Sequence, residues 1–316
     1  MIILKIGKMT NIKIAIHCLP HEIDYLMLTY IQLKKSKYHL SSRINVTIET
    51  CLNLSSYLIN WEESKLPKEF FINKYNQIAN LLEDYNHINK IYDGDKLYGH
   101  LDLQKEIVCK EADYYMGLCP DIYFSEYLLS YMIEAAIKVP NKYFNLIPQT
   151  SKLSDQSWDE ITDKKWMKIP YEDCYKQDTF DIRYHNKIDD SEREIIPVKN
   201  LKFGGWFDLM NKGFYEDLVP LQKSWSGYGP YDTYSMYVCH QLKQIGVDYQ
   251  QYMLKGETIF GYGSGPLKGE NVDGFKKYYQ DMIVMNDIPN QRAIFESKMG
   301  EYLNESINLL KDKNII

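Results

Sequence analysis

The sequence lacks any apolar run near the roughly 18 residues that a membrane-spanning helix needs. Its apolar start, residues 1–10, is not followed by a small-residue cleavage site, so we expect no signal peptide. Internal repeats and low-complexity segments are also absent. These absences predict a cytoplasmic protein without a membrane span, located in the host cytoplasm if the chain is viral.

Paired cysteines and an excess of positive charge are missing too. The six cysteines are scattered over 316 residues without a Cys-x-x-Cys pair, which is typical of reduced thiols rather than a disulfide framework. Lys and Arg number 37 against 43 Asp and Glu, so the net charge is −6. This charge argues against attachment to nucleic acid or anionic lipid by overall charge alone, and it leaves a local basic groove open.

Short apolar segments alternate with helical patterns through the first half of the chain. Strands are expected at 11–18, 43–50, 88–92 and 113–118, and helices at 22–35, 71–84, 101–112 and 126–138. The alternation predicts an α/β fold with a mostly parallel central sheet flanked by helices. Ligands of such sheets bind beyond the carboxyl ends of the strands. That edge is expected to carry His17, Glu49, Asp93, Asp95 and Asp121.

The second half of the sequence has a different composition. A polar stretch over 150–200 is interpreted as solvated loops and short helices, and glycine and aromatic residues are densest between 201 and 233. Further elements are expected as a strand at 143–149, a helix at 232–245, a strand at 249–254 and a helical tail at 275–311 broken at Pro289.

An acidic strand end is the first feature that suggests chemistry. The apolar segment 113–118 leads into Cys119-Pro120-Asp121. This segment resembles the metal-binding D-x-D segment of glycosyltransferases with the GT-A fold, in which two carboxylates hold Mg²⁺ or Mn²⁺ against a nucleotide-sugar diphosphate. The resemblance implies that Asp121 is a metal ligand. Cys119 replaces the first carboxylate, and a thiol is a poor ligand for a hard cation. The alternative is a strand end that an Asp merely caps.

Two later segments resemble other parts of the same family. Phe203–Asp208 is similar to its Gly-Gly-Trp acceptor strand, and Tyr228–Thr233 to the start of its Glu-Asp helix, with Tyr231 in the place of the Glu. The resemblance implies that Asp232 is the general base of an inverting enzyme, which deprotonates the acceptor hydroxyl. A helix N-terminus favours an ionised carboxylate there. The alternative is a plain N-cap.

The order of these motifs extends the resemblance over about residues 10–262. It implies a GT-A-like single domain with a nucleotide-sugar half at 10–140 and an acceptor half at 141–262. A C-terminal helical extension at 263–316 follows.

The resemblance also implies sets of binding residues. Donor contacts are expected from His17, Glu22, Glu49, Asp93, Asp95, Cys119 and Asp121, with Thr50 beside Glu49. Each is equally compatible with a structural role, such as the turn at 93–95. No His follows His240 to complete a metal site, so Lys255, Arg292 or Lys298 would pair with the diphosphate instead. The acceptor platform is expected from Gly205, Trp206, Asp208, Trp225, Tyr228 and Tyr231, with core packing the alternative for Trp206.

Three functions follow from these observations. The first is a glycosyltransferase, a hexosyl- or pentosyltransferase using a nucleotide-diphosphate sugar such as a UDP-sugar. The second is a phage or viral DNA-base glycosyltransferase acting on a hydroxymethylated base, with local lysine patches at 34–37 and 164–168 as the DNA contacts. The third is an inactive protein that binds sugar nucleotides or carbohydrate, suggested by the missing first Asp and the missing late His.

Overall fold

The computed structural model describes residues 9–56, 59, 61–62, 64, 66–96, 98–107, 111–152, 193–198, 207–221, 239–261, 293 and 297–316. The strands are β1 (Thr10–Cys18), β2 (Ile44–Asn53), β3 (Asn86–Tyr92), β4 (Tyr114–Leu118), β5 (Ile122–Tyr123), β6 (Tyr143–Lys152), β7 (Glu194–Pro197), β8 (Phe207–Asn211) and β9 (Tyr249–Gly261). The α-helices are α1 (Ile23–Lys37), α2 (Lys68–Ala79), α3 (His100–Ile107), α4 (Leu128–Lys138), α7 (Lys212–Leu218) and α11 (Met299–Asp312). Short 3₁₀ turns are η1 (Pro20–Glu22), η2 (Asn80–Leu82) and η6 (Val219–Leu221).

All nine strands belong to one sheet with the order β3-β2-β1-β4-β8-β6-β9-β5, and β7 pairs with β9 beside β5. The strands β3, β2, β1 and β4 are parallel, β8 runs antiparallel to β4 and β6, and β6 is parallel to β9. The parallel half is therefore the part that βαβ connections build, and the antiparallel β8 joins it to the second half.

The sequence of β1 explains its central place. Ile12, Ile14 and Ile16 point to one face of the sheet, and Ala15 and His17 point to the other. All five side chains are buried. A strand that buries both faces needs a nearly continuous run of apolar and β-branched residues, and this run supplies it.

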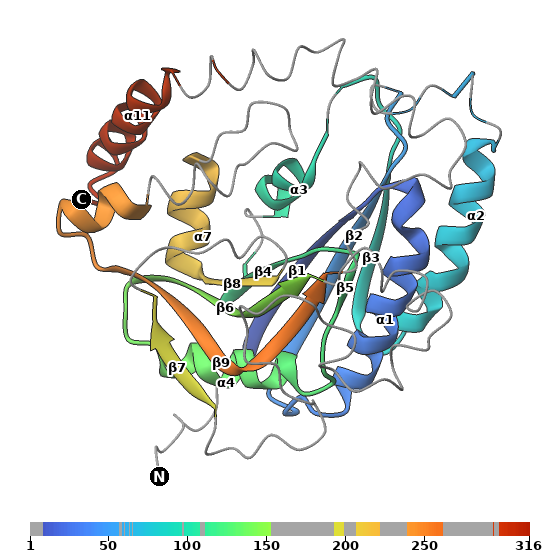
Figure 1. The fold of residues 1–316 in the computed structure, drawn as a ribbon, viewed down its shortest axis with the longest axis horizontal. Coiled ribbons are helices and arrows are strands. Elements are labelled where there is room, and N and C mark those ends of the chain that lie inside the picture. Colours follow the sequence, from blue (N-terminus) through green and yellow to red (C-terminus); the bar gives the residue numbers. More distant parts are fainter. Residues whose placement is uncertain are drawn as a thin grey trace.

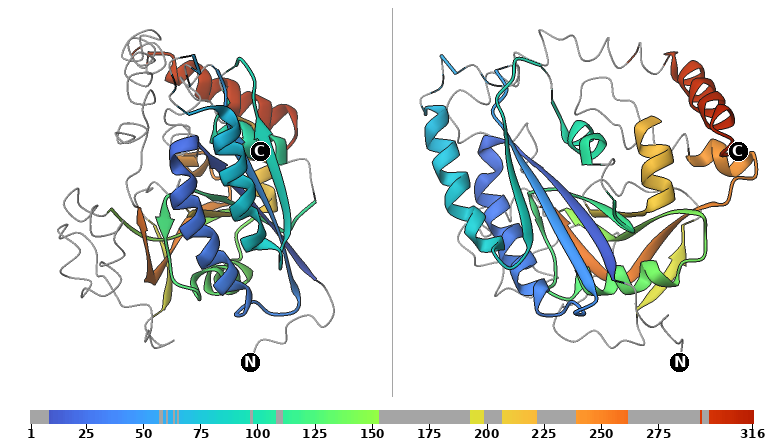
Figure 2. Two further views of the ribbon diagram at one scale, coloured as in Figure 1. Left: turned by 90° about the vertical axis from the view of Figure 1, so that its right-hand side faces the viewer. Right: turned by 180° about the vertical axis from the view of Figure 1, so that it is seen from behind.

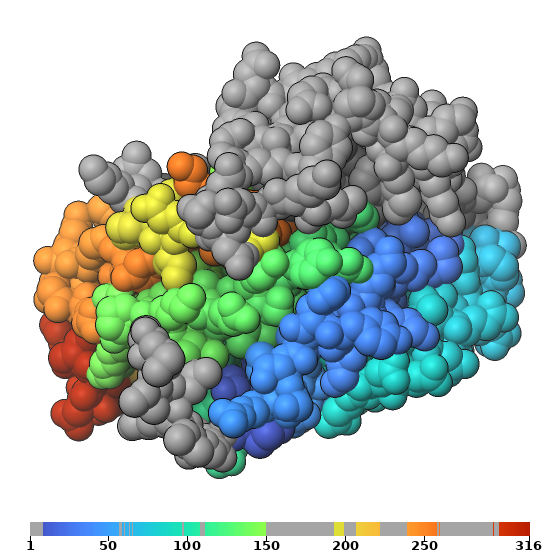
Figure 3. Space-filling view, turned by 90° about the horizontal axis from the view of Figure 1, so that it is seen from below, coloured from blue at the N-terminus to red at the C-terminus, as the bar shows by residue number. Residues whose placement is uncertain are grey.

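Two layers of helices cover the sheet. The first face packs against α1, α2 and α4 and forms the larger apolar cluster, and the second face packs against α3, α7 and α11 (Figures 1 and 2). Seen from below, α1, α2 and α4 lie side by side over the first face (Figure 3). The α/β class with a parallel central sheet flanked by helices is thus confirmed.

The expected elements of the first half are present, with shifted ends. One shift moves an expected site residue: β2 continues to Asn53, so Glu49 lies inside the strand rather than at its end. The interpretation of 150–200 as loops and short helices was wrong at both ends of that stretch. There β6 continues through Lys152, and β7 is a strand whose side chains are half-exposed at an edge. A polar edge strand lacks the apolar run that identifies a buried one.

Part of the expected second half lies outside the described residues. Residues 239–244 are helical, as expected, and β9 extends the expected strand to Gly261. Of the expected helical tail, α11 is described, whereas 275–292 lies outside the described part of the chain. Among the described residues, no helix is both long and apolar enough to cross a bilayer.

Candidate active site

The chain reverses its direction of travel across the sheet at β1. From β1 it proceeds through β2 to β3 at one edge, and then β4 returns to the other side of β1. Parallel sheets bind ligands at this kind of reversal, in the crevice beyond the carboxyl ends of the two strands. Here residues 17–22, at the end of β1 and just beyond it, lie beside residues 119–121, which follow β4, because β1 pairs with β4 up to Ile16 and Leu118. We call these two segments the switch-point site.

The loop with Asp121 is fixed by α1. The Thr29 hydroxyl donates to the carbonyls of Pro120 and Ile122, at 2.8 and 3.0 Å. Because these two carbonyls flank Asp121, the position of its backbone is set by a buried side chain. Asp121 itself remains partly exposed. The structure therefore presents this carboxylate at the strand end, as expected from the sequence.

Negative charge gathers on the α1 side of the switch-point site. Burial, together with the charges of Glu22 and Asp121, raises the pKa of the Cys18 thiol. Burial and the nearby carboxylates of Asp24 and Asp121 also raise the pKa of Tyr25. Asp121 therefore lies near enough to these groups to act on their charge.

Glu22 has a structural task within this group. Its Oε2 accepts a hydrogen bond from the Leu19 amide at 2.8 Å, which closes the turn between β1 and α1. The side chain is 8% exposed. The structure thus shows a turn-closing role for Glu22, and its expected donor contact stays a prediction.

A divalent metal fits the described residues poorly. In the described part of the chain, no three His, Cys, Asp or Glu side chains converge as a metal site would require. Cys119 offers a soft thiol where Mg²⁺ or Mn²⁺ prefers oxygen. The described donors therefore do not by themselves fit either ion.

The opposite side of the site is a buried hydrogen-bonded cluster. Asn53 Nδ2 donates to His17 Nε2 at 3.1 Å and to the Tyr98 carbonyl at 2.6 Å. The Asn53 Oδ1 accepts from the Ser55 amide at 2.9 Å. Burial, and after it the proximity of His100, lowers the pKa of His17 to about 3. His17 is therefore neutral near pH 7, with Nε2 as an acceptor.

α3 continues this cluster across the sheet. Nitrogens of Gln104 and His100 lie 2.8 Å apart, and burial lowers the pKa of His100 to about 4. Both side chains occupy the space above Gly117 of β4. A Cβ at Gly117 would overlap the Gln104 amide and lie 3.0 Å from His100 Nε2. Glycine is thus required for this close approach of helix and strand.

Asp208 of β8 continues the cluster beyond β4. It pairs with Gly117 across β4 and β8, and its Oδ1 accepts from Asn145 Nδ2 at 3.1 Å. The Tyr249 hydroxyl in turn donates to Asn145 Oδ1 at 2.8 Å. Burial raises the pKa of Asp208 to about 7. We call the whole series the polar belt: Asn53, His17, His100, Gln104, Asp208, Asn145 and Tyr249.

Most of the polar belt was not anticipated from the sequence. His17 and Asp208 were expected site residues, whereas Asn53, His100, Gln104 and Asn145 were not. The available signal was Asn53, an amide that directly follows the apolar pair Cys51-Leu52 at the end of β2.

Other expected donor residues lie elsewhere. Glu49 is buried inside β2 and forms an ion pair with Lys90, because the strand continues past it. Thr50 is buried beneath α1 and α2, where it accepts from the Tyr30 hydroxyl at 2.7 Å. Asp93 pairs with Lys68, and Asp95 is exposed in the following turn. The switch-point site thus retains His17, Glu22, Cys119 and Asp121 from the expected donor set.

Several expected residues fall outside the described part of the chain: Gly205, Trp206, Trp225, Tyr228, Tyr231, Asp232, Arg292, and the lysines at 164–168. Lys255 is exposed on β9, and Lys298 precedes α11. In the lysine patch on α1, the Lys34 Nζ lies 3.9 Å from Glu83, and the Lys37 Nζ lies 4.8 Å from the centre of the Tyr85 ring. Part of that patch is therefore engaged within the protein.

Comparisons with known proteins give a distant likeness. No family model matches the chain, and no curated protein matches it. Among solved structures, it is similar to S. aureus TarS 1-349, with a TM-score of 0.44, 9% identity, and coverage of 95% of this chain and 72% of that one. For TarS 1-349 in complex with UDP the TM-score is 0.42 at 8% identity, and the match covers 80% of this chain and 60% of that one. For the inositol-1-phosphate CTP transferase from T. maritima the TM-score is 0.41 at 9% identity, and the match covers 88% of this chain and 97% of that one. We transfer no residue role from these structures.

Proposed function

We propose that this chain is a glycosyltransferase that moves a sugar from a nucleotide-diphosphate sugar to an acceptor hydroxyl. One observation carries the proposal. Asp121 follows β4 directly beside the end of β1, where the strand order reverses and where an α/β sheet binds its ligand. The D-x-D resemblance of this same segment supports the choice of ligand.

Two helix starts support a diphosphate at this edge. α1 begins directly after β1, and α3 follows β3, so both helices start near the carboxyl ends of the strands. The N-terminal end of a helix carries partial positive charge, which favours phosphate oxygens. Asp24 and Asp102, in the first turns of α1 and α3, offset part of that charge. The polar belt supplies a hydrogen-bonded wall on the α3 side.

In the proposed mechanism Asp232 accepts the proton of the acceptor hydroxyl. The hydroxyl oxygen then forms a bond to the anomeric carbon of the donor as the bond from that carbon to the diphosphate breaks. The nucleoside diphosphate leaves with the bonding electron pair, and the sugar inverts its configuration. Asp121 acts on the donor side of this reaction, where its carboxylate accepts hydrogen bonds from donor hydroxyls, and the assignment of Asp232 rests on the sequence alone.

Turnover measurements test the proposal. The protein is incubated with a panel of nucleotide-diphosphate sugars, with and without Mn²⁺, and with glycan or duplex DNA acceptors, the DNA with or without hydroxymethylated bases. We expect Asp121→Asn to lower transfer by about tenfold or more, because an ionised carboxylate accepts hydrogen bonds from the hydroxyls of the donor more strongly than an amide does. Asp232→Asn should abolish transfer and retain donor binding.

Asp84→Asn is the matched control, because Asp84 is an exposed aspartate before β3, at the opposite edge of the sheet. Full transfer by Asp232→Asn would remove the general-base assignment. Donor binding without turnover across the panel would indicate an inactive sugar-nucleotide-binding protein, and neither binding nor turnover would contradict the proposal.

A further inference from the structure

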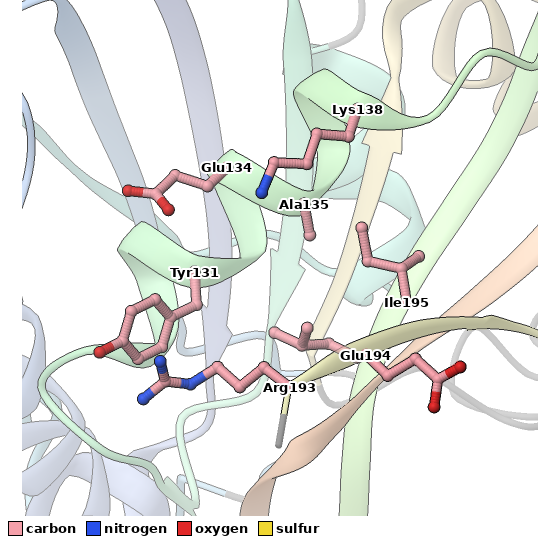
Figure 4. Close-up of a pocket in the computed structure, with 8 residues that line it drawn as sticks. Tyr131, Glu134, Ala135, Lys138, Arg193, Glu194 and Ile195 are labelled. Atoms are coloured by element: carbon pink, nitrogen blue, oxygen red, sulfur yellow. The ribbon is translucent and has the colours of Figure 1, made fainter. Parts of the chain in front are cut away.

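A cavity of about 540 Å³ lies between α4 and β7, away from the switch-point site (Figure 4). Sites for small molecules have volumes of roughly 300–1,000 Å³. α4 supplies one wall and the start of β7 the other, as Figure 4 shows. The lining residues are Tyr131, Glu134, Ala135, Lys138, Arg193, Glu194, Ile195 and Leu254.

One end of the cavity is formed by an immobilised arginine. The guanidinium carbon of Arg193 lies 3.4 Å from the centre of the Tyr131 ring. Its Nε donates to Glu257 Oε1 at 2.9 Å, and the two side chains are 11% and 2% exposed. A guanidinium that is both stacked and ion-paired is fixed in orientation before any ligand arrives.

A β-bulge places the partner of this arginine. The pairing of β9 with β6 shifts between Pro148 and Gln149, so that three residues of β9, 255–257, have no partner in β6. Gly256 has a φ of +90° within the bulge and donates its amide to Gln149 Oε1 at 3.0 Å. Bulges re-aim side chains. The bulge turns Glu257 into the protein, where it also accepts from the Ser125 hydroxyl at 3.3 Å.

The charges of the lining residues select the class of ligand. Lys138 and Arg193 are cationic, and Glu134 and Glu194 are anionic, so the formal charge of the lining is zero. Ammonium and guanidinium groups donate hydrogen bonds, and carboxylates accept them. A ligand that both donates and accepts without a net charge suits this arrangement.

The floor of the cavity adds a second requirement. Ala135, Ile195 and Leu254 give it an apolar surface beneath the charged rim. A sugar ring combines hydroxyls on its edge with C–H groups on its face. It can therefore meet the rim and the floor at the same time.

We propose that this cavity binds a neutral saccharide. Binding itself is independent of the function proposed above. If that function holds, the cavity takes a part of the acceptor glycan remote from the reacting hydroxyl, because Glu257 connects it through Ser125 to the chain that follows Asp121. This second role rests on the proposed function.

Saturation-transfer NMR on the full chain tests the proposal, with maltose, cellobiose, lactose and chitobiose as neutral probes and digalacturonate as the anionic one. We expect at least one neutral disaccharide to bind and digalacturonate to bind more weakly. Ala135→Trp fills the cavity from its floor and should weaken binding at least about tenfold. Ile137→Trp is the matched control, since Ile137 is exposed on the same helix and does not line the cavity.

A second variant covers the case in which Ala135→Trp does not fold. Glu134 and Lys138 are exposed, so the double variant Glu134→Ala, Lys138→Ala should fold and bind the same probe at least about threefold more weakly. The proposal is overturned if no neutral disaccharide binds, if digalacturonate binds best, or if both cavity variants bind as the unmodified protein does. Binding of the panel of nucleotide-diphosphate sugars is measured on the same samples. Donor binding without disaccharide binding rejects this inference alone, and disaccharide binding without binding of any donor in the panel rejects the proposed function.

Discussion

Gly117 of β4 lies opposite Asp208 of β8, and the space above Gly117 is filled by two side chains of α3. This arrangement joins the strand that leads to Asp121 with β8, which links the parallel half of the sheet to β6. It also means that the centre of the sheet is polar on its second face. The stability of the protein should therefore respond to substitutions and to pH in specific ways.

Gly117→Ala should destabilise the protein by about 1–3 kcal/mol, the usual cost of overpacking. The added methyl group would displace the buried Gln104 amide and press on His100. Urea denaturation measures the difference. Gly300→Ala is the control, because a Cβ at this position of α11 meets no atom within 4 Å. That substitution should be neutral or stabilise by up to about 1 kcal/mol, and an equal loss in both variants would contradict the explanation.

Asp208→Asn should stabilise the protein, and more so at pH 8 than at pH 5. Burial raises the pKa of Asp208 from 3.8 to about 7. Between these two pH values the native state keeps the proton on Asp208, whereas the unfolded state has lost it. Its contribution to stability is present below pH 3.8 and is lost as the pH rises through 7. An asparagine still accepts from Asn145 without a charge. We expect a gain on the order of 1 kcal/mol at pH 8, measured by denaturation at both pH values.

The exposed Asp95→Asn provides the comparison for Asp208. It should leave the pH dependence of stability unchanged. A gain for Asp208→Asn that is the same at pH 5 and pH 8 would show that the charge is not its cause.

His17→Gln should reduce the decrease in unfolding free energy that accompanies a fall in pH. The pKa of His17 is lowered to about 3 in the native state. Below about pH 6.5 the unfolded state therefore binds a proton at His17 that the native state does not bind. The contribution of His17 is present above pH 6.5 and is lost as the pH falls toward 3. Glutamine does not titrate. The unfolding free energy of this variant should therefore change less between pH 7 and pH 4, whereas His240→Gln, at an exposed position, should follow the unmodified protein.

Arg193→Met should cost about 3–5 kcal/mol, because it leaves the buried carboxylate of Glu257 without its cation. The double variant Arg193→Met, Glu257→Met should recover much of this loss, since it leaves no unpaired buried charge. A double-mutant cycle from urea denaturation gives the interaction free energy. Strictly additive losses would contradict the ion pair as the source of the effect.

The sequence predicted the parallel half of the fold because its central strands, β1 and β4, are buried on both faces. The apolar runs of β1 and β4 therefore stand out against the helical patterns between them. From the same runs it predicted the strand end that presents Asp121. The acceptor-half assignments at Trp206 and Asp232 remain predictions, because they lie outside the described residues.

Other features had no local signal. Glu49 was expected at a strand end because the strand was predicted to end at residue 50. In the structure the strand continues, because Lys90 forms an ion pair with Glu49 and the Tyr30 hydroxyl donates to Thr50. The cluster on α3 depends on contacts between residues far apart in sequence. The bulge at 255–257 depends on a mismatch between two strands, which neither strand reveals alone.

β9 is bonded along one side to β6 and along the other to β5 and β7 in turn. One strand therefore fastens both the segment after Asp121 and the segment after Arg193. A deletion of residues 255–257 would straighten β9 against β6 and slide these two attachments relative to each other by the length of three residues. The three extra residues thus set the distance along β9 between its attachments to β5 and β7, and with it the spacing of the two proposed binding sites.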